Sequence, residues 1–260
     1  MSLPSGGVPV RVAHRGLQLI PRWPTVADGK RLIFIRHAEG WHNKDYYEKP
    51  NYMEDHLGET EAYWDARLTP EGEKQSWNLA QKMQWRNQAQ LVELVAVSPL
   101  TRAIQTASIA FPNITVKDAT GGEMQRRVPF VATSLARERV WTHQCDRRRP
   151  RHVLETEFPH VNFSEIQEGD DDEMWPHKEI DPDPFNSTAV ATRGVRFLDW
   201  LWQRPEREIA IVSHWVFMRT LLRQFDHKEL HADFGNAEMR MVTLIKDEDH
   251  ATGEHGHDEL

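Results

Sequence analysis

The sequence predicts an α/β fold, a three-layer sandwich in which a mainly parallel central sheet is flanked by helices on both faces. Continuous apolar runs are typical of strands that are covered on both faces of such a sheet. Three of these runs occur, each followed by a segment with helical features, at residues 31–36, 91–97 and 208–213. Alternating strands and helices favour a parallel sheet, and 260 residues are enough for one domain of this class.

The first half of the chain divides at residue 30. Residues 1–29 are rich in Pro and Gly and are expected to form an irregular N-terminal arm. Residues 44–66 show no clean hydrophobic period and are predicted to form a long excursion. A helix is predicted at 70–86, because Thr69 can cap its first turn and Pro70 suits its first position.

The second half contains the remaining elements of the predicted domain, which spans residues 30–246. The strand at 91–97 leads through Ser98 and Pro99 into a helix that ends near Ala110. The other predicted elements are a short strand at 128–132, a polar excursion at 139–187, a helix at 188–203, a helix after the strand at 208–213 that runs to about 225, a strand at 239–245 and a polar tail at 247–260.

Composition excludes several classes of function. A net charge of −8 argues against nonspecific nucleic-acid binding, which needs a basic surface. One cysteine, Cys145, cannot form an internal disulfide or a cysteine-rich metal site. No apolar run is long enough to cross a membrane, and no signal-peptide core is present near the N-terminus. We therefore expect a cytoplasmic protein, in which the C-terminal HDEL is a chance resemblance to a retention signal.

The predicted buried strands end in residues that can bind an anion. Arg36 and His37 follow the first strand, Arg102 lies in the first turn of the helix after the second, and His214 follows the strand at 208–213. Ligands of open α/β sheets bind outside the carboxyl ends of parallel strands, where helix N-termini favour anions and arginine forks bind phosphate oxygens. Each residue alone is more often structural, but four at equivalent positions indicate a pocket for a phosphoryl group.

Four separated motifs resemble those of the histidine phosphatase superfamily, also called phosphoglycerate mutase-like proteins. They occur in the expected order between about residues 31 and 246, as RHAEGWHN (36–43), SPLTRAIQTA (98–107), IAIVSHW (209–215) and FGNAEMR (234–240). The opening motif and the central CDRR are most similar to a eukaryotic branch of the family.

This resemblance implies a mechanism and a set of site residues. His37 would attack phosphorus and form a phosphohistidine. Arg36, Arg102 and His214 would clamp the phosphoryl oxygens, and Asn43 would add a neutral donor to the same group. A carboxylate between the second arginine and the second histidine would protonate the leaving group, and Glu138 matches best.

The resemblance, rather than the spacing, selects Glu138 over Glu123 and Glu155. The simpler interpretation of Glu138 is a surface carboxylate that pairs with Arg139. Asn236 could bind substrate, lie behind the phosphate pocket or merely shape a turn. Arg149, with Arg147 and Arg148, could bind a second anionic group of the substrate or pair with the acidic run at 168–173.

Two positions depart from the family pattern. Ala38 stands where many members have Gly, which a negative φ would tolerate. Trp215 stands where many relatives have a small residue, so it could narrow the pocket, offer a stacking surface or face the core.

The function expected from these residues is phosphomonoester hydrolysis through a phosphohistidine, on a small phosphorylated substrate. A phosphoglycerate mutase and an inactive phospho-ligand-binding module are the alternatives. We expect no cofactor, no metal, and no nucleic-acid or membrane partner. His250, His255 and His257 lie in the polar tail and match no recognised metal-site spacing.

Overall fold

The computed structural model describes residues 16–21, 29–85, 88–112, 114–117, 123–176 and 187–246. The strands are β1 (Leu17–Pro21), β2 (Lys30–Arg36), β3 (Leu94–Val97), β4 (Ile114–Lys117), β5 (Glu123–Arg126), β6 (Phe130–Ala132), β7 (Val161–Asn162), β8 (Glu208–Ser213) and β9 (Met239–Lys246). The helices are α1 (Trp41–Glu48), α2 (Pro70–Trp85), α3 (Gln88–Leu91), α4 (Thr101–Ala110), α5 (Arg151–Glu157), α6 (Thr188–Gln203) and α7 (Trp215–Leu222).

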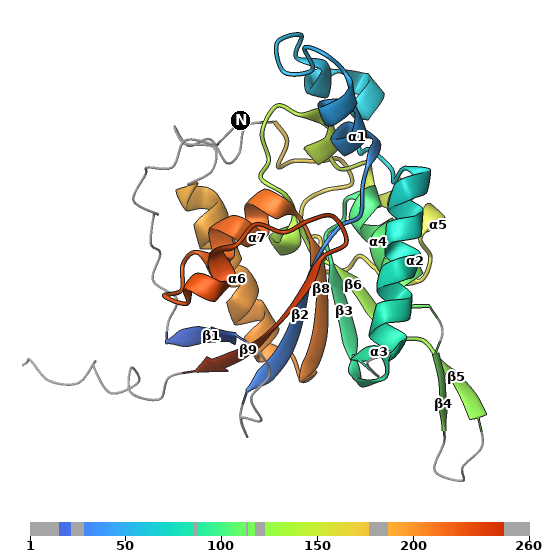
Figure 1. Cartoon of the computed structure of the whole chain (residues 1–260), viewed down its shortest axis with the longest axis vertical. Helices are drawn as coiled ribbons and strands as arrows, with labels where there is room; N and C mark the ends of the chain where they lie inside the picture. Colours follow the sequence, from blue (N-terminus) through green and yellow to red (C-terminus); the bar gives the residue numbers. More distant parts are fainter. Residues whose placement is uncertain are drawn as a thin grey trace, which may run out of the picture.

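The central sheet confirms the predicted fold class. Its strand order is β1-β9-β2-β8-β3-β6-β7. The strands β2, β8, β3, β6 and β7 run parallel to one another, whereas β9 is antiparallel to both β1 and β2. The helices α2 and α4 lie on one face and α6 and α7 on the other (Figure 1). Among the described residues, no helix combines the length and apolar character that crossing a bilayer requires.

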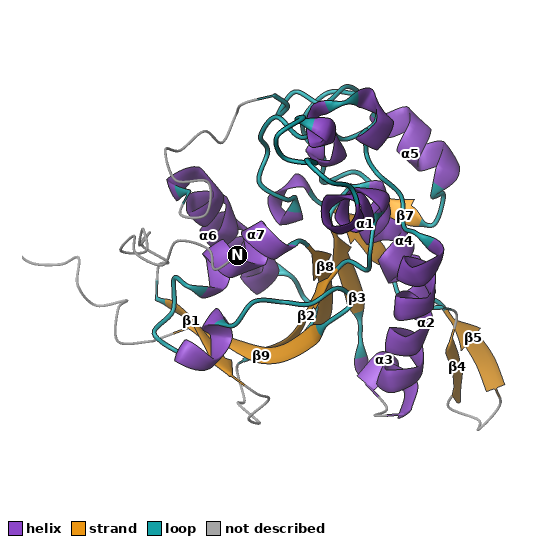
Figure 2. Cartoon of the chain, turned by 45° about the horizontal axis from the view of Figure 1, so that its top comes forward, coloured by secondary structure: helices purple, strands orange, loops and turns teal. Residues whose placement is uncertain are grey.

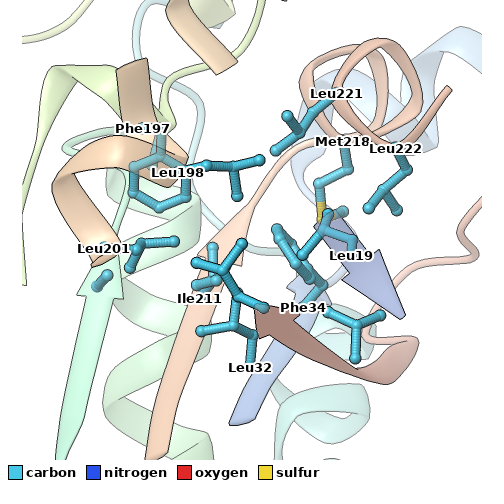
Figure 3. Close-up of a cluster of buried hydrophobic side chains, with 14 of the residues drawn as sticks. Leu19, Leu32, Phe34, Phe197, Leu198, Leu201, Ile211, Met218, Leu221 and Leu222 are labelled. Atoms are coloured by element: carbon cyan, nitrogen blue, oxygen red, sulfur yellow. The ribbon is translucent and has the colours of Figure 1, made fainter. Parts of the chain in front are cut away.

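The continuous apolar runs arise because each strand contributes to two cores. Successive side chains of a strand point to opposite faces of the sheet. In β2, Ile33 and Ile35 pack in the cluster with α2 and α4, whereas Leu32 and Phe34 pack in the cluster with α6 and α7. Figure 3 shows the second cluster, in which Phe197 and neighbouring leucines lie over β2 and β8.

Residues 17–21 correct the prediction of an irregular arm. They form β1, an edge strand that pairs with β9, and Leu17 and Leu19 are buried. An edge strand tolerates Pro21, which is why proline content was a poor guide there. The rest of the arm, residues 1–15 and 22–28, lies outside the described residues, as does the predicted tail at 247–260 with its histidines and HDEL.

Other boundaries also differ from the prediction. Leu91 belongs to the short helix α3 and is exposed, so the strand predicted at 91–97 begins only at Leu94, where pairing with β8 starts. The β4–β5 hairpin was not predicted. It extends from the end of the sheet opposite α1 (Figure 1).

The two predicted excursions contain ordered elements. Residues 41–48 form α1, and the region at 139–187 includes α5 and the edge strand β7. Both regions lie over the carboxyl ends of the parallel strands (Figure 2). A small cluster joins them, because Tyr52 and Tyr63 of the first region pack with Cys145 of the second. The excursions therefore form a cap over one end of the sheet.

The N-terminus of α2 is fastened to the chain that follows β2. Thr69 caps the helix as predicted, by accepting a hydrogen bond from the Gly72 amide (3.0 Å), and its own amide donates to the Glu39 carbonyl (3.0 Å). A Cβ on Gly72 would lie 2.1 Å from the Glu39 carbonyl oxygen. Only glycine permits this close approach of two backbones.

We predict that Gly72→Ala destabilises the fold by about 1–2 kcal/mol. Alanine favours a helix by about 1 kcal/mol over glycine, but the collision with a backbone oxygen costs more than that gain. Denaturant unfolding checks the change, with the exposed Asn78→Ala of the same helix as the control that should be neutral or stabilising. A Gly72→Ala protein as stable as Asn78→Ala would contradict the close packing.

Candidate active site

The parallel register brings the predicted site residues to one edge of the sheet. Arg36 pairs in register with Ser213, and Val97 with Val212, so β2, β3 and β8 end side by side. The chain then continues from each strand end into His37, Ser98 or His214. The rings of His37 and His214 have centroids 4.9 Å apart.

His37 is oriented so that Nε2 carries a free electron pair. Its Nδ1 lies 2.7 Å from the Ala38 carbonyl oxygen, which can only accept, so the proton resides on Nδ1. Burial, followed by the positive charges of Arg102 and Arg36, lowers the pKa of His37 well below its usual value. The ring is therefore neutral at neutral pH. Ala38 is not among the described residues with positive φ, in agreement with the tolerance expected of it.

Arg102 is buried and is held by three contacts. Its Nε donates to His37 Nε2 (3.2 Å), its Nη2 to Asp146 Oδ1 (2.9 Å), and its Nη1 to the Cys145 carbonyl. The ion pair with Asp146 compensates a guanidinium that is only 1% exposed. Asp146 was not identified from the sequence, because only its arginine neighbours in the CDRR segment suggested a role.

Arg36 lies beside these groups at the end of β2. Its Nη1 donates to the Phe234 carbonyl (2.7 Å), which anchors the side chain, and its Nε is buried without a partner among the described residues. The half-buried guanidinium thus keeps unused donors at an edge where an anion would supply acceptors.

His214 is also neutral. Burial and the charge of Arg102 lower its pKa well below the usual value. Its Nε2 lies 2.7 Å from the Ser98 hydroxyl, and its Nδ1 is buried without a partner within the described part of the chain. The site therefore contains more than one polar atom that lacks a protein partner.

The Glu138 carboxylate lies at the N-terminus of α7, the helix that begins directly after His214. Its carboxylate accepts hydrogen bonds from the amides of Phe217 (2.9 Å) and Val216 (3.1 Å). Arg193 of α6 donates to the Glu138 carbonyl (3.1 Å) and holds this turn against the helix. Burial and then the negative charge of Asp146 raise the pKa of Glu138 above its usual value.

The two competing carboxylates are not in this position. Glu155 is exposed on α5 and pairs with Arg151 one turn away (3.5 Å). Glu123 begins β5, in the hairpin at the opposite end of the sheet, and its side chain lies outside the described set (Figure 1). The negative charge of Glu138 acts on both Arg36 and Arg102.

Asn43 and Asn236 both form hydrogen bonds with the backbone of residues 37–40. The Asn43 amide oxygen accepts from the Gly40 amide (3.1 Å), which leaves its NH₂ group for a ligand. Asn236 Nδ2 instead donates to the His37 carbonyl (3.2 Å), as does the Ala237 amide (3.3 Å). This bond agrees with the alternative in which Asn236 lies behind the phosphate pocket, and a contact with substrate stays a prediction.

Arg149, a candidate for binding substrate, is engaged by groups of the protein. Its Nε bonds Asp65 (3.0 Å), its Nη1 bonds Glu157 (2.8 Å), and its Nη2 bonds Thr101. Two carboxylates already neutralise its charge, so the guanidinium joins α5 to the start of α4.

The neighbouring arginines are also bound by the protein. Arg147 lies between the rings of Trp64 (4.7 Å) and Trp175 (4.8 Å). Arg148 donates to carbonyls of residues 169–171, which agrees with the alternative that this run holds the acidic segment.

Two further questions from the sequence concern Trp215 and metal binding. The Trp215 ring is half-buried and lies under Arg219 (5.5 Å) of its own helix.

Donor atoms of His143, Cys145 and Asp146 lie within 4.8 Å of one another. Because Arg102 already occupies the Asp146 carboxylate, we assign no metal site to this group.

Comparisons with known proteins show the family of this chain. A profile of the histidine phosphatase superfamily (branch 1) matches residues 32–119. Phosphoglycerate mutase-like protein from Arabidopsis thaliana is 38% identical over 241 residues, covering 83% of this chain and 84% of that protein. Phosphoglycerate mutase-like protein 1 from the same plant is 31% identical over 239 residues, covering 83% and 81%. A putative alpha-ribazole-5'-P phosphatase structure from Escherichia coli aligns with 19% identity and a TM-score of 0.47, covering 82% and 90%. The chain belongs to the histidine phosphatase superfamily.

We predict that Arg102→Lys lowers kcat/KM for a phosphomonoester by about 10²-fold or more. An ammonium group keeps the charge, but it cannot reach His37 and the 145–146 segment with a planar fork. Steady-state kinetics check the loss, with Arg149→Lys as the control, because its guanidinium contacts only protein groups. Near-normal kinetics for Arg102→Lys would place Arg102 outside the reaction.

Proposed function

We propose that this protein hydrolyses phosphomonoesters of a small substrate through a phosphohistidine intermediate on His37. The observation that carries the proposal is the state of the His37 ring. Its Nδ1–H is fixed by the Ala38 carbonyl, and the basic Nε2 lies 3.2 Å from a guanidinium nitrogen of Arg102. A nucleophilic nitrogen beside a buried cation suits attack on phosphorus, where negative charge is spread over the equatorial oxygens.

In the first step, the Nε2 electron pair forms the N–P bond while the P–O bond to the leaving group breaks. Arg36 and Arg102 stabilise the phosphoryl oxygens, and the free NH₂ of Asn43 adds a neutral donor. Glu138, whose pKa is raised by burial and by the negative charge of Asp146, gives its proton to the departing oxygen. The product alcohol leaves with that proton.

In the second step, water attacks the phosphorus of phosphohistidine. The Glu138 carboxylate accepts a proton from that water, the N–P bond breaks, and its electron pair returns to Nε2. Inorganic phosphate leaves, and both His37 and Glu138 return to their starting states. One carboxyl group thus serves as acid and then as base.

The pairing of Arg147–Arg149 with groups of the protein favours hydrolysis over mutase activity. A phosphoglycerate mutase must hold a substrate that has a second anionic group while its phosphoryl group is handed back. The sequence candidates for that second contact, Arg147–Arg149, bind tryptophan rings, carbonyls and carboxylates of the protein instead. Hydrolysis of p-nitrophenyl phosphate by the purified protein tests the proposal, because a mutase or an inactive binding module should be poor at it.

We predict that His37→Ala abolishes turnover and the covalent intermediate together. Rapid alkaline quench of the wild-type protein with ³²P-labelled substrate should trap a phosphoenzyme that is stable in base and is lost on later treatment with acid, as a phosphoramidate is. The control is His56→Ala, since His56 is exposed and bonded to Glu59. An active His37→Ala protein would exclude the mechanism.

We predict that Glu138→Gln slows alkyl phosphate hydrolysis far more than phosphoryl transfer from p-nitrophenyl phosphate. An alkoxide needs the proton to leave, whereas nitrophenolate does not. In the wild-type protein, burst rates on the alkyl ester should fall as pH rises through the raised pKa of Glu138, because the acid form is then lost. This decline should be absent in Glu138→Gln.

The comparison requires burst-phase rates, because the second step also uses Glu138. Glu155→Gln is the matched control, since Glu155 is exposed on α5. Equal losses on both substrates in Glu138→Gln would show that Glu138 shapes the site without acting as the acid.

A further inference from the structure

His42 is a half-buried histidine beside the nucleophile that has no part in the steps above. It lies in the first turn of α1, and its ring centroid is 5.8 Å from that of His37. A Cβ on Gly40 would lie 2.9 Å from its Nδ1 and 2.8 Å from its Cε1. The ring is therefore packed against the Gly40 backbone, and Nε2 is the nitrogen left for another molecule.

The hydrogen-bonding capacity of this imidazole is unused. Its Nδ1 is buried without a partner, and neither ring nitrogen forms a hydrogen bond with any residue in the described ranges. Buried polar groups are nearly always paired, because an unpaired one has lost its hydrogen bonds to water without replacement. A ring held only for packing would carry no such cost if it were an apolar residue. Because Nδ1 is enclosed beside Gly40, a ligand can pair with this ring only through Nε2.

The charges around His42 are positive or neutral. Arg102 reaches it from α4, Arg36 from β2, and His143 from the segment before residues 144–146. His42 is also close enough to His37 and His214 for its charge to affect their pKa values. On its own helix, Asp45 is bonded to Lys49 (2.8 Å) and Tyr63 (2.7 Å). Burial, Arg102 and Arg36 lower the pKa of His42 well below its usual value, so the ring is neutral in the empty site.

A bound phosphate dianion reverses this balance. Its two negative charges offset the guanidinium groups that disfavour an imidazolium, and its oxygens accept hydrogen bonds from an N–H donor. A neutral histidine in contact with such a dianion gains a proton and becomes a charged donor. Without the dianion, His42 is neutral beside the two cations Arg36 and Arg102. With the dianion bound, His42 becomes a third cation.

We propose that His42 is a further ligand of the phosphoryl group, which it binds by taking a proton from solvent onto the ring and donating Nε2–H to a phosphoryl oxygen. The inference rests on the proposed function, since it requires a phosphoryl group at His37. It assigns the proton uptake to a residue outside the steps of hydrolysis. Binding of a tetrahedral dianion should therefore consume more protons with His42 present than without it.

Calorimetry with tungstate tests the proposal without turnover, because tungstate is a tetrahedral dianion that does not titrate near neutral pH. Titrations in buffers of different ionisation enthalpy count the protons taken up. His42→Phe keeps a ring against Gly40 and His37, whereas His42→Gln keeps a neutral amide without a titrating proton. His56→Gln removes an exposed histidine and is the control.

The expected result is a loss of proton uptake, by as much as one proton, in both His42 variants. Affinity should fall about tenfold or more in His42→Phe and less in His42→Gln, as for a lost hydrogen bond to a charged group. His56→Gln should match the wild type. Thermal unfolding of each variant confirms that the fold is retained.

Wild-type affinity and proton uptake in a folded His42→Phe protein would overturn the inference, even if hydrolysis through His37 were established. Tungstate binding that loses its proton uptake in both His42 variants would support it, even if the protein hydrolysed no phosphomonoester. Failure of the wild-type protein to bind tungstate would overturn both.

Discussion

A buried arginine organises the carboxyl end of this sheet. Arg102 donates to the nucleophilic nitrogen of His37, to the Cys145 carbonyl and to the Asp146 carboxylate, and almost none of it reaches solvent. A guanidinium in such a place requires a carboxylate and further acceptors, since an unpaired buried charge is strongly destabilising. The segment around residue 145 must therefore cross the strand ends, and Glu138 lies a few residues before it.

Burial and the nearby charges together set the protonation of the site. Burial, followed by the positive charge of Arg102, lowers the pKa values of His37 and His214. Neutral imidazole is the form that can attack phosphorus. The pKa of Glu138 moves upward, because its burial is reinforced by Asp146. The same arrangement therefore provides a base where a nucleophile is needed and an acid where a leaving group needs a proton.

The cap over the site is a folded structure with its own polar core. Arg147 lies between two tryptophan rings, Arg148 binds the carbonyls of the acidic segment, and Arg149 joins Asp65 to α5. Three consecutive arginines suggest an anion-binding patch, yet each of them is paired with rings, carbonyls or carboxylates of the protein itself. The acidic residues that neutralise or orient them come from segments up to 86 positions away, which is why their role could not be inferred from local sequence.

The sequence by itself determined the fold class, the helix at 188–203 and the convergence of Arg36, His37, Arg102 and His214, because these depend on local periodicity and on where strands end. Only the tertiary structure decided the strand at residues 17–21, the role of Asp146, the engagement of Arg149 and the unpaired ring of His42. Each of these depends on a partner from a distant segment. Hydrogen bonding and charge pairing act through space, so a residue's neighbours are defined only once the chain has folded.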